Sequence, residues 1–127
     1  MKARSLVLLV GLASAPIRAL GCGACIEDKV AATYDHAVMT QAAAQHHVVV
    51  FASVDSWPGG KAVAQAIRRT AASSKGVDAR SVRVSDEPSA LSFALDPATG
   101  SPDSVVAEIE TRLHVKGVKL TIIRVAS

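Results

Sequence analysis

Two cysteines, Cys22 and Cys25, are the residues whose type and spacing point most directly to chemistry. Two thiolates at this spacing suffice for near-linear coordination of Cu(I), a soft ion that prefers sulfur donors. The same Cys-x-x-Cys pattern at the start of a helix is typical of thiol-disulfide redox motifs, because unpaired backbone N–H groups and the helix dipole favour the thiolate. The third interpretation is a structural disulfide in an oxidising compartment.

The position of this pair favours metal binding over the other two interpretations. A disulfide between Cys22 and Cys25 would close a ring of only four residues near a chain end, so it would stabilise the fold little. Redox motifs of the thioredoxin type follow a strand, and no strand is predicted ahead of Cys22. We therefore expect Cys22 and Cys25 to be metal ligands and no catalytic residues, with thiol-disulfide exchange as the one enzymatic alternative.

The histidines are not expected to complete a zinc site with the cysteines. In a single helix with a rise of about 1.5 Å per residue, His36 would lie about 16 Å from Cys25 and His46 about 30 Å from it. Zinc ligands must all lie within about 2.3 Å of one ion. The predicted site is therefore a two-sulfur site, unless the helix breaks or a second chain supplies a histidine.

Residues 1–21 have the three parts of a secretory signal peptide. Lys2 and Arg4 form a basic start, an apolar run extends over residues 6–15, and small residues lead to Gly21. The apolar run is too short to span a bilayer. We expect cleavage after Gly21, so that Cys22 becomes the first residue of a periplasmic or secreted protein without a transmembrane anchor. A lipid anchor on Cys22 is the lesser alternative.

Charge excludes one class of partner. Lys2, Arg4 and Arg18 are three of the 14 basic residues, whereas all 11 acidic residues follow the leader, so the predicted exported chain has balanced charge. The whole chain also holds only four aromatic residues, too few for a platform on which bases stack. Nucleic acid is therefore not an expected partner.

The pattern after the leader predicts a leading helix and then one small domain. Residues 22–45 contain the Cys-x-x-Cys segment and a single helix over 26–45, and residues 46–127 form the domain. The domain is expected to contain a buried strand over 48–52, a helix over 61–73, two half-buried strands around 82–84 and 91–95, a helix from Ser101-Pro102 that Gly117 stops, and a strand over 118–125.

This order, β-α-β-β-α-β, predicts a ferredoxin-like α+β fold. Its four strands form an antiparallel sheet, and both helices of the domain lie on one face of that sheet. The helix over 26–45 is an additional element at the N-terminal side. In the loop over 53–61, Trp57 is expected to fold over the sheet edge, and a docking point for a partner protein is the alternative.

Two short segments resemble the heavy-metal-associated domain family, which includes periplasmic mercury-binding proteins and copper chaperones. They are Gly76-Val77 leading into residues 82–85, and residues 92–97 ahead of a helix. The resemblance implies a carrier of Cu(I) or Hg(II) that passes the ion to a metal-transfer protein. The family holds its ion with a Cys-x-x-Cys in the loop after the first strand, and here that loop, residues 53–61, contains no cysteine.

We therefore expect an exported carrier of a thiophilic ion that uses Cys22 and Cys25 instead. Two alternatives remain open. One is a periplasmic thiol-disulfide redox protein, and the other is a metal-free module that binds a protein partner through its sheet or the Trp57 loop.

Overall fold

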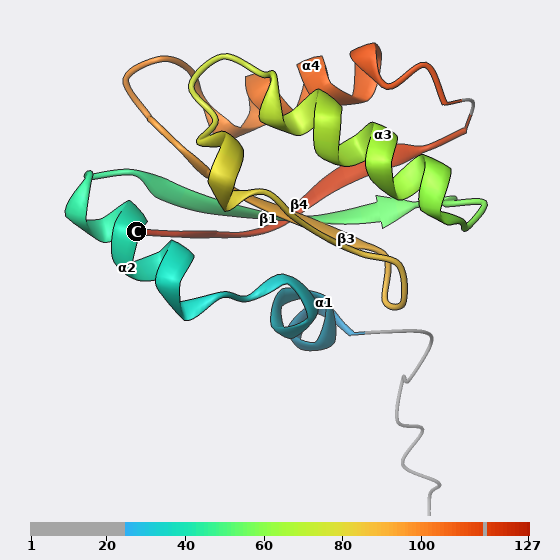
Figure 1. Ribbon diagram of the computed structural model, residues 1–127, viewed down its shortest axis with the longest axis horizontal. Coiled ribbons are helices and arrows are strands. Elements are labelled where there is room, and N and C mark those ends of the chain that lie inside the picture. Colours follow the sequence, from blue (N-terminus) through green and yellow to red (C-terminus); the bar gives the residue numbers. More distant parts are fainter. Residues whose placement is uncertain (1–24, 116) are drawn as a thin grey trace, which may run out of the picture.

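One antiparallel sheet is the centre of the fold (Figure 1). The structure is a computed structural model that describes residues 25–115 and 117–127, so Cys22 and the predicted signal peptide over residues 1–21 lie outside the described residues. The strands are β1 (Val48–Asp55), β2 (Arg83–Ser85), β3 (Ala90–Leu95) and β4 (Lys119–Ala126). They lie in the order β2-β3-β1-β4, and every neighbouring pair is antiparallel.

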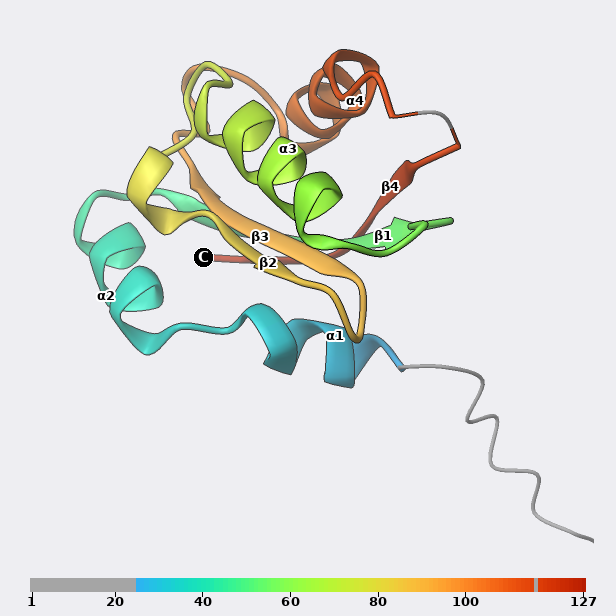
Figure 2. The same cartoon turned by 45° about the vertical axis from the view of Figure 1, so that its right-hand side comes forward.

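Two helices, α3 (Lys61–Ala72) and α4 (Pro102–Arg112), lie side by side on one face of this sheet (Figures 1 and 2). The predicted hairpin is present, because β2 pairs with β3 with Val84 opposite Leu91. Strand order, strand direction and helix placement together confirm the predicted ferredoxin-like α+β fold. No helix in the described part of the chain is long and apolar enough to cross a membrane.

The main hydrophobic core lies between the sheet and these two helices. Ile67 of α3, Ile109 of α4 and Phe93 of β3 are fully buried there. α4 begins as predicted, because the Ser101 hydroxyl accepts a hydrogen bond from the Ser104 amide and Pro102 is the first helical residue. The apolar faces predicted for both helices therefore face the sheet.

α4 ends earlier than predicted. Its last residue is Arg112, and His114 has a left-handed φ of 50°. Because a left-handed residue cannot continue a right-handed helix, the chain leaves the helix before it reaches Gly117, and the expectation that Gly117 stops the helix is wrong.

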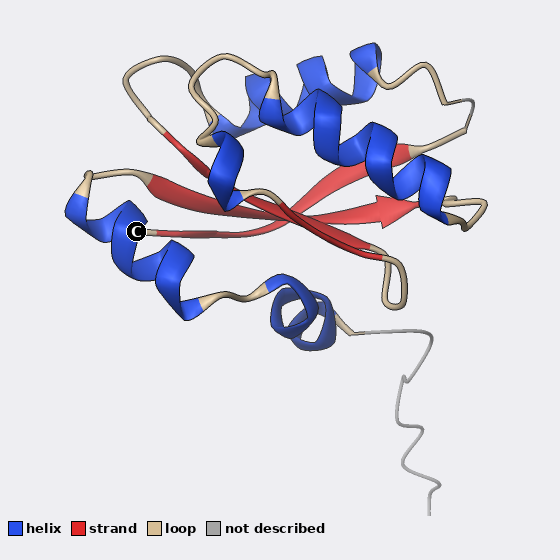
Figure 3. Ribbon diagram, viewed as in Figure 1, coloured by secondary structure: helices blue, strands red, loops and turns tan. Residues whose placement is uncertain are grey.

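The leading helix is broken into two, which corrects the prediction of one helix over residues 26–45. The structure has α1 (Ile26–Thr33) and α2 (His36–Ala44), separated by Tyr34 and Asp35 (Figure 3). The Asp35 carboxylate accepts hydrogen bonds from the amides of Ala37 at 2.8 Å and Val38 at 3.3 Å, so Asp35 is the N-cap of α2. An N-cap has extended backbone, which is incompatible with a helix that continues through it.

α1 and α2 lie on the face of the sheet opposite α3 and α4 (Figures 1 and 2). Val30 and Val38 pack there against Phe51 and Ala94 in a second, smaller hydrophobic core. With helices on both faces, all six residues of β3 are buried. The expectation that β3 is half-buried is therefore wrong, because the sheet has no open face over this strand.

An ion pair fixes the break between α1 and α2. Arg83 of β2 donates to the Asp35 carboxylate from Nε at 3.2 Å and from Nη2 at 3.0 Å. These hydrogen bonds are the main reason that the pKa of Asp35 lies below its usual value of 3.8, and the amides of Val38 and Ala37 lower it further while partial burial opposes them.

This lowered pKa predicts a pH-dependent contribution to stability. The folded state favours the charged carboxyl, so the contribution is complete above the pKa of the unfolded chain and is lost as the pH falls through the lower folded pKa. Urea unfolding of the parent chain and of Asp35→Asn tests this, since asparagine keeps the cap but not the charge. The parent should be more stable by a constant margin from pH 7 to about pH 5, and the margin should shrink below about pH 4. A margin that stays constant to pH 2.5 would show that the carboxylate charge contributes nothing.

Candidate functional site

Cys25 is the predicted site residue that the structure describes. It precedes α1 as its N-cap residue and is exposed, and its backbone carbonyl accepts a hydrogen bond from the Lys29 amide at 3.1 Å. The Cys25 Sγ donates to Oδ2 of Asp28 at 3.3 Å, which is the side-chain contact seen for this thiol. Cys22 lies outside the described residues, so the predicted convergence of the two sulfurs remains a prediction.

A groove of about 760 Å³ lies next to the first turn of α1. We call it the α1 groove. It is lined by Asp28 and Lys29 of α1, by residues 54–57 at the end of β1, and by residues 86–89 in the turn between β2 and β3. The start of α1 thus lies beside the loop between β1 and α3. This is the loop in which the heavy-metal-associated family, according to the resemblance, holds its ion.

Trp57 lies partly buried in the wall of the α1 groove. Its ring packs against the main core, and its Nε1 is buried without a hydrogen-bond partner among the described residues. The indole is therefore folded onto the protein, as expected, and does not project from the loop as a docking point would.

Most charges in the α1 groove are negative. Its lining contains the carboxylates of Asp28, Asp55, Asp86 and Glu87, against the single ammonium of Lys29. One of these carboxylates already has partners within the protein, because Asp55 accepts hydrogen bonds from the hydroxyls of Ser53 and Thr121, both at 2.9 Å. The peptide bond between Glu87 and Pro88 is cis.

The histidines near the cysteine in the sequence belong to α2 and to the connection that follows it. His36 is the first residue of α2, and His46 and His47 connect α2 to β1. Because the helix is broken at Asp35, the distances counted along one continuous helix no longer apply, and the exclusion of the histidines from the site stays a prediction. No group of three or more His, Cys, Asp or Glu side chains within residues 25–115 and 117–127 is arranged to hold a metal ion.

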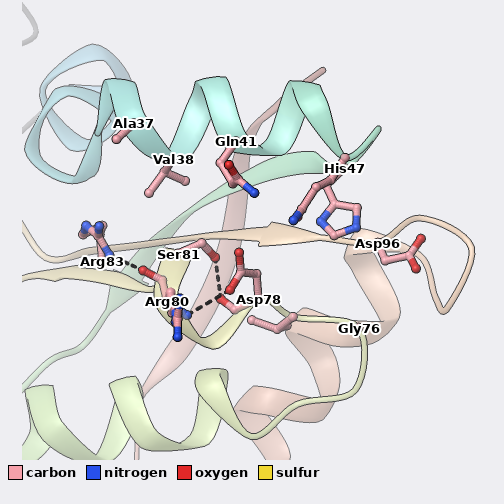
Figure 4. A pocket seen from close by; sticks show the side chains of 12 residues that line it. Ala37, Val38, Gln41, His47, Gly76, Asp78, Arg80, Ser81, Arg83 and Asp96 are labelled. Carbon is pink, nitrogen blue, oxygen red and sulfur yellow. Dashed lines mark hydrogen bonds between the residues drawn. The ribbon is translucent and has the colours of Figure 1, made fainter.

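A second groove, of about 750 Å³, lies between α2 and the segment over residues 76–83 (Figure 4). We call it the α2 groove. Gln41 and His47 lie on one wall, across from Asp78 and Ser81. The Arg83 Nη1 donates to the Arg80 carbonyl at 2.8 Å at one end of the groove.

Sequence analysis missed both grooves and the ion pair of Asp35 with Arg83. The pair joins residues that are 48 positions apart, so no local pattern predicts it. One local signal did exist, because an aspartate ahead of the helix-forming run His36–Ala44 is typical of an N-cap.

No protein-family model, no curated protein and no solved structure matches this chain. None of these comparisons identifies the heavy-metal-associated family, so the function must be argued from the site itself.

Proposed function

We propose that this chain is an exported small carrier of a thiophilic ion, Cu(I) or Hg(II), with Cys22 and Cys25 as the two ligands and a metal-transfer protein as its partner. The observation that carries the proposal is the position of the Cys25 thiol, which is exposed at the start of α1. An ion that passes between thiolates on two proteins needs ligands that the second protein can reach.

The packing of α1 supports the same proposal. The helix that follows Cys25 is held on the sheet by the buried Val30 and by Lys29, whose Nζ donates to the Ser53 hydroxyl at 2.5 Å. One ligand of the proposed pair is thus attached to a packed element, while the thiol remains accessible. The pair would then lie next to the loop between β1 and α3, at the same end of the sheet as the site implied by the resemblance.

A thiol-disulfide redox function is the second candidate, because Cys25 is an N-cap residue and its exposed thiol is open to attack by another thiol. The two functions differ in what they require. A carrier must retain one ion per chain with both thiols reduced, whereas a redox protein must cycle between dithiol and disulfide.

Replacing either cysteine by serine is expected to abolish tight Cu(I) binding. A hydroxyl is a poor ligand for a soft ion, and one remaining thiolate cannot form a two-sulfur site. Anaerobic titration of the reduced chain with Cu(I) against a competing chelator measures this. The parent chain should take one Cu(I) from the chelator, and Cys22→Ser and Cys25→Ser should each take none.

Met39→Leu is the matched control. Its thioether is the other soft donor in the described part of the chain, it packs in the second core, and its loss should leave the Cu(I) affinity unchanged. If Cys25→Ser binds Cu(I) as tightly as the parent, the proposed ligand pair is wrong. If the parent binds no Cu(I) but shows a reversible disulfide in a glutathione redox titration, the redox function replaces the carrier function.

A further inference from the structure

The two faces of the sheet are covered to very different extents. Among the described residues, the core beneath α3 and α4 contains fourteen buried residues, whereas the core beneath α1 and α2 contains six. No residue belongs to both cores. Because the free energy of burial grows with the apolar area removed from water, α1 and α2 are held by much less hydrophobic stabilisation than α3 and α4. We call α1 and α2 together the cover.

The contact between the cover and the sheet is also more polar than a typical core. The buried Ser92 hydroxyl of β3 donates to the Thr33 carbonyl at 3.1 Å, and Lys29 bonds to Ser53 of β1. The Thr33 hydroxyl is buried at this contact and has no hydrogen-bond partner among the described residues. An unpaired buried hydroxyl opposes closure, because water would satisfy it in an open state.

Two ion pairs fasten the cover to strands at opposite edges of the sheet. Arg83 of β2 holds Asp35 between α1 and α2, and Arg124 of β4 donates to Glu27 at the start of α1. The pair with Glu27 is the more exposed, since 70% of that side chain is accessible against 33% of the Asp35 side chain. Exposed pairs contribute little, so the pair of Asp35 with Arg83 is the stronger of the two ion pairs.

The connection between the cover and the sheet is short and ends in a defined turn. The amide of His47 donates to the Ala42 carbonyl at 2.8 Å and the amide of His46 donates to the Ala43 carbonyl at 3.2 Å, which is the hydrogen-bond pattern of a Schellman cap. His46 has a φ of 56°, in the left-handed region that costs a residue other than glycine some free energy. A turn of this kind can change its backbone angles without disturbing β1.

We propose that the cover opens from the sheet as one unit, with the Arg83 and Asp35 pair as its fastening and residues 45–47 as its hinge, while the ferredoxin-like domain stays folded. Opening would move the start of α1, which carries Cys25, and would uncover the back face of the sheet at Val49, Phe51 and Ala94. This inference concerns the motion of the metal-free chain and does not depend on the proposed metal function.

Native-state hydrogen exchange of the whole metal-free chain tests the proposal. Helices as short as α1 and α2 are not stable in water once they leave the sheet. Amides bonded within the cover, such as Lys29 to Cys25 and Met39 to Asp35, should therefore exchange through a shared opening. Their protection should be at least about tenfold lower than that of the amides between β1 and β3, which should exchange only by global unfolding.

Two variants should shift this opening selectively. Asp35→Asn keeps the cap and removes the charge, and Arg83→Gln removes the guanidinium, so each should lower the protection of the cover by about threefold to tenfold and leave the amides between β1 and β3 unchanged. Arg83 also donates to the carbonyls of Arg80 and Val82, and Asp35→Asn leaves those hydrogen bonds in place. If both variants lower the protection of the cover by the same factor, the loss is due to the ion pair and not to those hydrogen bonds.

Arg112→Gln is the matched control, because Arg112 bonds to Ser73 and Ser74 on the other face of the sheet. It should leave the exchange of the cover unchanged. The proposal is overturned if the amides of the cover are as protected as those between β1 and β3, or if the two selective variants change the cover no more than Arg112→Gln does.

Discussion

Replacing Phe93 by alanine is expected to lower the free energy of unfolding by about 3–5 kcal/mol, the usual cost of removing a buried phenyl ring. Phe93 is fully buried in β3, the strand that lies between β1 and β2. Its ring faces the main core beneath α3 and α4, where Ile67 and Leu91 are also fully buried. Because these neighbours belong to a sheet and to a helix packed on it, they cannot collapse far into the cavity.

Urea unfolding followed by circular dichroism measures this loss. Tyr34→Ala is the matched control, because Tyr34 is an aromatic residue of similar size that is 51% exposed, and its loss should change stability by no more than about 0.5 kcal/mol. Equal losses in the two variants would mean that Phe93 does not lie in a packed core.

Replacing Gly76 by alanine is expected to cost about 2–4 kcal/mol, through two separate effects. Gly76 has a φ of 84°, which disfavours any side chain. A methyl group at this position would also lie 1.9 Å from Oγ1 of Thr99. The Thr99 hydroxyl donates to the Asp96 carbonyl at 2.8 Å, so it cannot move away without losing that hydrogen bond.

Gly59→Ala separates the two effects. Gly59 has nearly the same φ, 85°, and no atom lies within 4 Å of a methyl group placed there. Gly59→Ala should therefore cost only the free energy of the left-handed backbone, about 1–2 kcal/mol. The double variant Gly76→Ala/Thr99→Ala should recover part of the loss of Gly76→Ala, because the closest atom is then gone. Equal losses for Gly59→Ala and Gly76→Ala would contradict the close approach of Thr99.

The elements of the ferredoxin-like domain could be predicted because each has a strong local pattern. The run of β-branched residues at the start of β1 is typical of a central strand, and Ser101-Pro102 is typical of a helix start. The predicted end of α4 was wrong because the left-handed conformation of His114 has no sequence pattern as clear as a glycine. Ends of elements depend on such single residues.

The cover could not be predicted, because its form depends on contacts between distant residues. A helix over residues 26–45 satisfies most local preferences, and the break at Asp35 is fixed both by its local role as an N-cap and by its contact with the distant Arg83. The burial of β3 on its second face follows from the packing of Val30 and Val38 against Phe51 and Ala94, which lie far away in the sequence. The alternation of apolar and polar residues in a strand predicts which face is apolar. It does not predict whether another element covers the opposite face.

One part of the candidate site could likewise be predicted from the sequence, and another part could not. The spacing of Cys22 and Cys25 is a local pattern. The structure shows that Cys25 is exposed at a helix start, and the role of the pair as metal ligands stays a prediction. The α1 groove, which Asp28 and Lys29 of the same helix line, is formed by three segments, around residues 28, 55 and 87, which only the folded sheet brings together. Its lining therefore had no signal in the sequence.

The most direct test of the carrier function is native mass spectrometry of the full chain expressed in a bacterium, purified from the periplasm, reduced and loaded with Cu(I) under anaerobic conditions. The predicted result is a polypeptide mass that begins at Cys22 with one Cu(I) bound, and no copper on the variant in which both cysteines are serine. A reduced parent chain that carries no copper, or copper that persists in the double variant, would contradict the proposal that Cys22 and Cys25 hold the ion.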